Sequence, residues 1–242
     1  MSLESHVENW KESQRIADVI SQSFPSTPQA FEARFRLGEA QVQQGQFKEG
    51  YATLSELRSV AALPSTVEWR PQLDLLWAES QLGLLDHDYG PLRTELEAFL
   101  ASNPDPVLAD QAHEILGRAD YQDSKFDNAR HHLKLVVESK ASEKSALAAK
   151  AQFLIGECFL SQKKYESAVN EYQKVYSLYP FPAWQAPALY QISQCDIVMK
   201  EWMNAKSTLD TLIKEFPNSE QAKAAATDLQ TVLQNLPASD KP

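Results

Sequence analysis

The chain has 242 residues, enough to bury a large hydrophobic core in one domain or two. Its formal net charge is −10, which argues against nucleic acid and anionic membrane surfaces as partners, because both are bound by basic faces. Seven glycines and little alternation of β-branched residues argue against an all-β fold, and no apolar run approaches the roughly 20 residues that span a bilayer.

Helical periodicity predicts a series of helices along the whole chain. The first covers about residues 5–24 and is followed by five helix pairs. The pairs cover residues 28–63, 67–103, 106–140, 143–179 and 183–216. A last helix over residues 219–236 has Asn218 or Ser219 as its N-cap, and its many alanine and polar residues are typical of a capping helix.

The helix pairs are copies of one repeat. Each second helix opens on an aromatic residue, and these residues are 37 to 42 positions apart: Trp10, Phe47, Tyr89, Phe126, Tyr165 and Trp202. Nine positions earlier, the first helix carries a small residue: Gly38, Ser80, Gly117, Gly156 and Ser193. A small residue inside a helix is tolerated where another helix must come close, so we expect the two helices of a pair to meet there.

One copy of the repeat is the most regular, and another departs from the pattern. The regular copy carries Gly156, Tyr165, Ala168, Tyr172 and Pro180. Proline ends its second helix because it lacks the amide hydrogen that a helix needs. In the copy that opens at Tyr89, the bulky Leu92 replaces the small residue of the second helix. We expect that pair to pack at an unusual angle.

The chain begins on the second helix of a repeat, and two explanations stay open. Either the sequence is a piece of a longer array, or the first helix is a natural cap. Met1-Ser2-Leu3 resembles an expression remnant, which favours the fragment.

The spacing of glycine, aromatic, alanine, aromatic and proline residues resembles the tetratricopeptide repeat over about residues 5–236. Two departures are the missing early tryptophan and repeats longer than the usual length of about 34 residues. The stretches FPNSEQAKAA and YPFPAWQAPAL are similar to bacterial cell-envelope members of the family, such as the Tol–Pal coordinator and outer-membrane assembly lipoproteins. The resemblance implies an all-α, right-handed superhelical solenoid of antiparallel helix pairs, with about 12 helices in a single domain over residues 1–242.

In such a solenoid the first helix of each pair lines the concave face. The resemblance therefore implies peptide-binding candidates three before, one after and four after the small residue. They are Phe35, Glu39, Trp77, Gln81, Arg118, Tyr121, Phe153, Glu157, Leu160, Tyr190 and Gln194. For the aromatic residues two interpretations stay open, a groove or the core between successive pairs. Arg118 could meet a partner carboxylate or pair with Glu114 one turn away.

Enzyme motifs are absent from the sequence, so we expect no catalytic site, no cofactor and no metal site. The triplet Asp86-His87-Asp88 is predicted to be a polar turn. Cys158 and Cys195 occupy equivalent positions in successive first helices. Because packed helices lie about 8–10 Å apart and a disulfide needs closer α-carbons, we expect two half-buried free thiols.

We therefore expect a non-catalytic scaffold that binds a peptide or partner helix in the concave groove. The alternative is a structural spacer or self-association module of a larger multidomain bacterial protein, which includes a homo-oligomer. In both cases the partner is a protein or peptide, without nucleic acid or direct membrane insertion. For the compartment, the envelope similarity favours the periplasm, whereas free cysteines fit a reducing cytoplasm.

Overall fold

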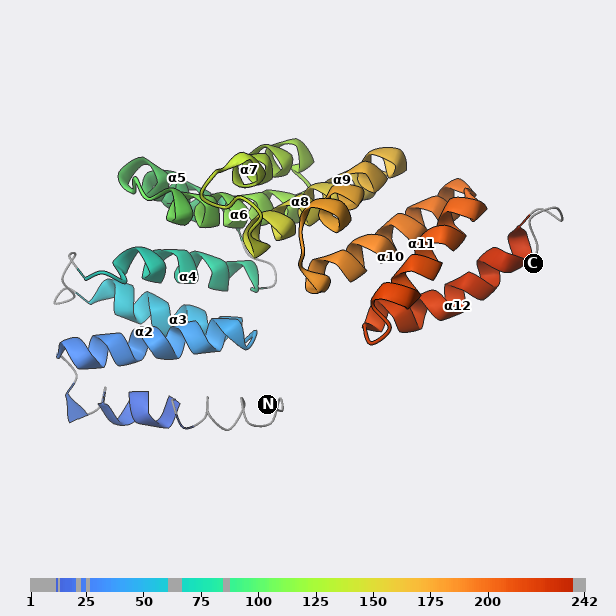
Figure 1. The fold of residues 1–242 in the computed structure, drawn as a ribbon. Coiled ribbons are helices and arrows are strands. Elements are labelled where there is room, and N and C mark those ends of the chain that lie inside the picture. Colours follow the sequence, from blue (N-terminus) through green and yellow to red (C-terminus); the bar gives the residue numbers. More distant parts are fainter. Residues whose placement is uncertain are drawn as a thin grey trace. The chain divides into compact units, whose positions relative to one another are not determined.

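The computed structural model describes residue 12 and residues 14–20, 23–24, 27–60, 67–84 and 88–236. All regular secondary structure in this part of the chain is helical (Figure 1), which confirms the all-α fold class. Residues 14–20 are helical. Trp10, Pro25, Pro64, Asp86-His87 and residues 237–242 lie outside the described residues. Within the same ranges, no helix has the length and apolar character needed to cross a membrane.

Helices α2 to α11 alternate as first and second helices of a pair, and α12 follows them (Figure 1). Their bounds are α2 Pro28–Gln43, α3 Phe47–Ser59, α4 Arg70–Leu82, α5 Gly90–Ser102, α6 Pro106–Gln122, α7 Phe126–Glu138, α8 Ala146–Ser161, α9 Tyr165–Leu178, α10 Pro182–Met199, α11 Trp202–Glu215 and α12 Glu220–Asn235. Serine or threonine side chains cap α2, α8 and α12 by accepting a backbone N–H of the first turn.

The chain forms two compact units, residues 1–115 and 116–242, and the boundary falls within α6. In the first unit, α3 packs against both α2 and α4. In the second, α9 packs against α8 and α10, and α11 packs against α10 and α12. Each of these second helices is therefore held between the first helix of its own pair and the next helix along the chain.

The two helices of a pair approach each other at the small residue of the first helix, as the repeat pattern predicts. A Cβ atom added to this residue would overlap the side chain sixteen residues further on, in the second helix. The three glycine pairs are Gly38 with Leu54, Gly117 with Leu133, and Gly156 with Tyr172. At Gly156 the added atom would lie 2.5 Å from the Tyr172 ring. Glycine at this place thus sets how closely the helices pack.

Four of the turns between paired helices share one backbone conformation. The residue two positions before the opening aromatic has a positive φ angle: Gly45 (74°), Ser124 (59°), Lys163 (58°) and Lys200 (63°). At each turn, the next residue donates its N–H to the carbonyl five positions back, as Lys164 does to Phe159 at 2.9 Å. This pair of features ends the first helix and reverses the chain. A side chain costs about 1–2 kcal/mol in this left-handed conformation, and glycine avoids that cost.

Both cysteines are fully buried, which corrects the expectation of half-buried thiols. Cys158 packs with Leu133 and Ile155, and Cys195 lies in the large apolar cluster of the second unit. Neither forms a disulfide. Burial raises the pKa of each thiol to about 12, so both are protonated at neutral pH.

Asp196 is an acidic residue inside the second unit. Its side chain follows Cys195 near the end of α10 and is only 4% exposed. Burial raises the pKa of its carboxyl from 3.8 to about 6, and the nearby Glu201 carboxylate adds to this shift. At neutral pH the folded protein therefore keeps a charged group in a poorly solvated place.

We predict that Gly156→Ala destabilises the protein by about 1–3 kcal/mol, because the added methyl group overlaps the Tyr172 ring and forces the helices apart. Urea unfolding followed by circular dichroism measures this change. The control is Ser177→Ala, which also places alanine in a helix but at an exposed position of α9, and it should have little effect. An unchanged stability of Gly156→Ala would contradict the close approach.

We predict that Asp196→Asn stabilises the protein at pH 7.5 by about 1–3 kcal/mol. The raised pKa means that the folded state binds the proton more tightly than the unfolded state, so the wild type loses stability as pH rises from about 4 to above 6. The gain should therefore disappear at pH 4. Unfolding in urea at both values measures it.

The control for Asp196→Asn is Asp210→Asn. Asp210 is exposed and pairs with Lys206 at 2.7 Å, so its loss should give a small destabilisation at pH 7.5. A gain for Asp196→Asn that persisted unchanged at pH 4 would contradict the explanation by burial of charge.

Candidate functional site

Two polar bridges join α10 to α8 and to α12 in the second unit. Gln191 Nε2 in α10 donates to Glu157 Oε1 in α8 at 3.3 Å. Gln194 Nε2, one turn later in α10, donates to Asp228 Oδ2 in α12 at 2.8 Å. In both bridges the two residues are 34 positions apart. The sequence candidates Glu157 and Gln194 are therefore both fixed by a side chain of a neighbouring helix.

A tyrosine from the second helix also reaches Glu157. The Tyr172 hydroxyl donates to Glu157 Oε1 at 2.5 Å. Burial raises the pKa of Glu157, and the hydrogen bond from Tyr172 partly opposes this shift. Burial and the adjacent carboxylate raise the pKa of Tyr172, which therefore stays a hydrogen-bond donor at neutral pH. The Glu157 carboxylate is thus oriented by two donors from two different helices.

Three apolar or aromatic candidates lie on the same two first helices. Phe153 is half-buried, and its ring centroid is 5.2 Å from that of Tyr172 and 5.6 Å from that of Trp184. Leu160 and Tyr190 are also half-buried. Burial raises the pKa of Tyr190, and Asp228 adds to the shift by charge and by a hydrogen bond. Each of these three side chains packs against the large apolar cluster of the second unit and is partly exposed to solvent.

In the first unit the candidates differ in exposure. Phe35 is only 2% exposed and stacks on Trp69 with the ring centroids 4.8 Å apart. Of the two interpretations for the aromatic residues, groove or core, Phe35 therefore fits the core. Gln81 is also 2% exposed. Glu39 is half-buried and accepts a hydrogen bond from Arg36 at 3.0 Å. Phe35 and Gln81 therefore cannot contact a partner in this structure, which corrects their placement on an exposed face.

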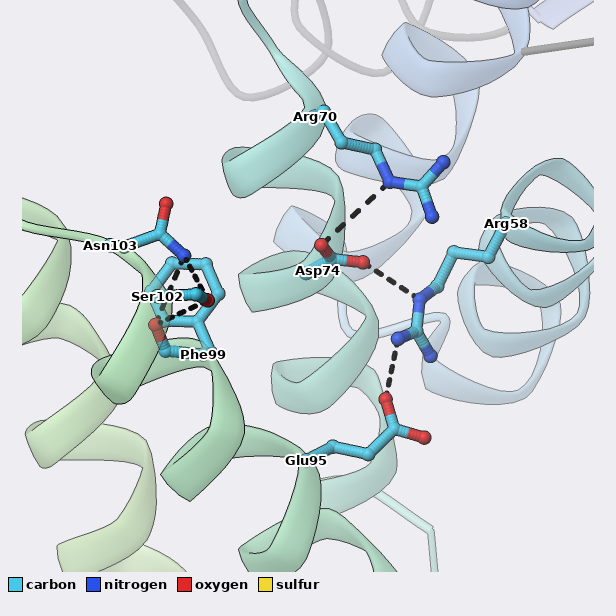
Figure 2. Close-up of polar contacts among 7 residues, drawn as sticks. All are labelled: Arg58, Arg70, Asp74, Glu95, Phe99, Ser102 and Asn103. Atoms are coloured by element: carbon cyan, nitrogen blue, oxygen red, sulfur yellow. Dashed lines mark hydrogen bonds and ion pairs between the residues drawn. The ribbon is translucent and has the colours of Figure 1, made fainter. Parts of the chain in front are cut away.

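Trp77 belongs to an ion-pair network that the repeat pattern did not predict. The guanidinium carbon of Arg58 lies 3.8 Å from the centre of the Trp77 ring, and the indole N–H donates to Ser55 Oγ at 3.0 Å. Arg58 donates through Nε to Asp74 at 2.8 Å and through Nη2 to Glu95 at 2.5 Å (Figure 2). Arg58 thus connects α3 with both α4 and α5.

A cavity of about 250 Å³ adjoins this network between α3, α4 and α5. Ser102 and Asn103 lie at its α5 end, where both donate to the Phe99 carbonyl at 3.1 and 3.0 Å (Figure 2). α4 packs more extensively on α3 than on its own partner α5. This looser pair contains Leu92, the bulky residue at which the sequence departs from the repeat.

The two candidates of α6 that lie in the second unit are Arg118 and Tyr121. The Tyr121 hydroxyl lies 3.0 Å from Ser161 Oγ of α8, and its ring meets Phe126 edge to face at 5.8 Å. Arg118 is half-buried. Its pairing with Glu114 stays a prediction.

The arrangement supplies hydrogen-bonding groups and aromatic edges, which are groups that commonly contact a protein partner. In the described part of the chain, no three His, Cys, Asp or Glu side chains gather in a way that could hold a metal ion. The residues that sequence reasoning missed are Gln191, Asp228 and Arg58. The repeats of this chain are 37 to 42 residues apart, so the 34-residue offset of the two bridges does not follow from the repeat pattern, and nothing in that pattern points to Arg58 either.

Comparison with known proteins supports the repeat assignment. Models of the tetratricopeptide repeat match residues 32–60, 116–182 and 187–219. No curated protein matches the chain in sequence.

Solved structures share the fold at low sequence identity. The apo form of RapI has a TM-score of 0.64 at 12% identity, and the match covers 96% of this chain and 70% of RapI. BtubC from P. vanneervenii has a TM-score of 0.62 at 14% identity, with 94% and 93% covered. A chain of the APC/C hetero-tetramer Cut9–Hcn1 has a TM-score of 0.62 at 18% identity, and the match spans only 40% of it.

These likenesses show the fold of a helix-pair solenoid. The three stretches that match the repeat models together make up more than half of the 242 residues, and they include the Gly156 repeat with its close helix contact. The chain therefore belongs to the tetratricopeptide repeat family.

Proposed function

We propose that the protein is a non-catalytic scaffold that binds a peptide or a partner helix along α8 and α10. Tetratricopeptide repeats are typical of modules for protein–protein interaction. The observation that carries the proposal is the combination of half-exposed Phe153, Leu160 and Tyr190 with the two polar bridges beside them. Side chains that are already fixed lose little conformational entropy when a partner binds.

The proposed surface combines apolar contact with hydrogen bonding. Phe153 and Leu160 offer an apolar strip along α8, and Tyr190 adds an aromatic ring on α10. The Gln194 amide already donates a hydrogen bond to Asp228. A partner would therefore contact the hydrogen-bonded pair of Gln194 and Asp228 and not a free amide. Glu39, Arg118 and Tyr121 belong to other helices and stay candidates on those helices, whereas Trp77 is only 8% exposed and its ring is covered by Arg58.

The alternative function is a spacer or self-association module. The exposed Val198 and Met203 beside the turn between α10 and α11 give it some support, since apolar side chains at a surface favour contact with another protein. Sedimentation at several concentrations tests the self-association module, because only self-association raises the measured mass with concentration. The cell-envelope branch of the family and a periplasmic location stay predictions.

We predict that Tyr190→Ala lowers capture of a cellular partner at least tenfold and destabilises the protein by only about 1–2 kcal/mol. The matched control is Tyr176→Ala, because Tyr176 is also half-buried and hydrogen-bonded to a carboxylate, Glu215 at 2.9 Å, but lies on the second helix α9. The Tyr176→Ala variant should capture the partner as well as the wild type does. Affinity purification with quantitative mass spectrometry, beside thermal unfolding, measures both effects.

Equal loss of capture in the two tyrosine variants would contradict the assignment to the first helices. Loss of stability in Tyr190→Ala without loss of capture would make Tyr190 a packing residue.

A further inference from the structure

Two carboxylates flank α10 in the second unit, Glu157 of α8 and Asp228 of α12. α10 packs against both of these helices. Gln191 Nε2 donates to Glu157 at 3.3 Å, and Gln194 Nε2 donates to Asp228 at 2.8 Å. The Tyr190 hydroxyl also hydrogen-bonds to Asp228. Residues three and four apart lie on one side of a helix, so both carboxylates adjoin a single face of α10. We call Glu157 and Asp228 the carboxylate pair.

Glu157 has a second donor from inside the unit. The hydroxyl of the buried Tyr172 donates to Oε1 at 2.5 Å, and the Gln191 amide reaches the same oxygen. Glu157 is itself half-buried. The two hydrogen bonds therefore hold the carboxylate in one orientation and leave its Oε2 atom for a further donor.

Neither member of the carboxylate pair forms an ion pair within the part of the chain that the structure describes. Burial raises the pKa of Glu157, the hydrogen bond from Tyr172 opposes this shift, and no basic side chain contributes to it. By contrast, two acidic residues of the second helices α9 and α11 each bind a lysine, Glu171 at 2.9 Å and Asp210 at 2.7 Å. The face beside α10 thus carries negative charge that its own chain does not neutralise.

The second unit as a whole has no excess of charge. Residues 116–242 contain 15 basic and 15 acidic residues. No net charge of the unit therefore draws a charged partner from a distance, and selection by charge must come from contact with the carboxylate pair. A partly buried carboxylate without a cation gains from one, because an opposite charge within about 4–6 Å favours its ionised form.

The surroundings of Glu157 suit a long basic side chain. Phe153 lies one turn before Glu157 on α8 and Leu160 one turn after it, and both are half-buried. Lysine and arginine have an apolar stem and a charged end, so the stem can pack on these side chains while the end reaches the carboxylate. Tyr190 offers an aromatic edge beside Asp228 in the same way. Each carboxylate thus lies next to an apolar neighbour.

We propose that the carboxylate pair selects the partner of this face by binding two basic side chains of one partner segment. The inference rests on the proposed function, since it concerns the partner of the same face, and it adds that this partner is a protein with lysine or arginine at two contacting positions. α10 separates α8 from α12 and packed helices lie about 8–10 Å apart, so the two basic groups are roughly 10–20 Å apart.

Selection from a displayed library of random peptides, with the immobilised wild-type protein as the target, tests the proposal. Peptides of about 16 residues span about 24 Å as a helix and more when extended, which covers both carboxylates. We expect lysine and arginine to be at least twofold more frequent among the selected peptides than in the library. Selected peptides without this enrichment would overturn the proposal and leave the proposed function standing, whereas a library that yields no binder would overturn both.

The double variant Glu157→Gln/Asp228→Asn removes both charges and keeps an acceptor oxygen at each position. In fluorescence anisotropy, we expect it to bind a selected basic peptide at least tenfold more weakly than the wild type does. The same peptide with glutamine in place of lysine and arginine should bind both proteins equally. Tyr190→Ala, which tests the proposed function, should weaken the binding of both peptides. Equal affinity of the basic peptide for the wild type and the double variant would overturn the proposal.

The matched control is the double variant Asp210→Asn/Glu215→Gln, which removes two negative charges from the second helix α11. Glu215 also accepts a hydrogen bond from a tyrosine hydroxyl, that of Tyr176 at 2.9 Å. This control should bind the basic peptide within about twofold of the wild type, because exposed charges away from the face are screened by solvent. A loss as large as that of the carboxylate-pair variant would mean general charge attraction and would overturn the proposal.

Unfolding in urea, followed by circular dichroism, separates recognition from a merely structural role. Burial penalises the charge of Glu157, so the carboxylate-pair variant should have an unfolding midpoint equal to or higher than that of the wild type. A lower midpoint together with lost binding would make the pair structural and overturn its role in selection. The single variant Glu157→Gln should show the same separation of binding from stability.

Discussion

The structure depends on one steric condition, the close approach of the two helices of a pair. Where the first helix has glycine, the side chain sixteen residues later fills the space that a Cβ atom would take, as Tyr172 does over Gly156. The same contact brings the Tyr172 hydroxyl within 2.5 Å of Glu157. Helix packing and the orientation of a surface carboxylate are thus consequences of one missing methyl group. The function that we propose uses side chains whose positions follow from this contact.

Much of the fold could be predicted because helix pairing is a local property. The opening aromatics, the small residues and the prolines all lie within one repeat, so spacing alone indicates the helices and their closest contact. Burial is harder to predict, because it depends on segments outside the repeat. Phe35 is covered by Trp69 from the segment before α4, and no repeat position corresponds to that contact. Cys158 and Cys195 are likewise more deeply buried than their positions in the repeat indicate.

The candidate site was predictable only in part, for a related reason. The first helices and several of their residues follow from the repeat, but the partners of these residues come from neighbouring repeats. Asp228 lies in the last helix, outside the repeat pattern, and yet it holds Gln194. Arg58 and Glu95 meet across two second helices, where family resemblance assigns no role. Charge pairing between repeats depends on the individual side chains, which the shared spacing does not determine.

Each of the four left-handed turns also fixes the rotation, about its own axis, of the second helix that follows it. An α-helix turns by about 100° per residue, so one residue inserted between Lys163 and Tyr165 would swing every side chain of α9 through more than a quarter of a circle. Tyr172 would then leave Gly156, and a polar or exposed neighbour would face the first helix instead. The connection can therefore vary in chemistry, as its lysine and serine residues show, but it cannot change in length without repacking the pair.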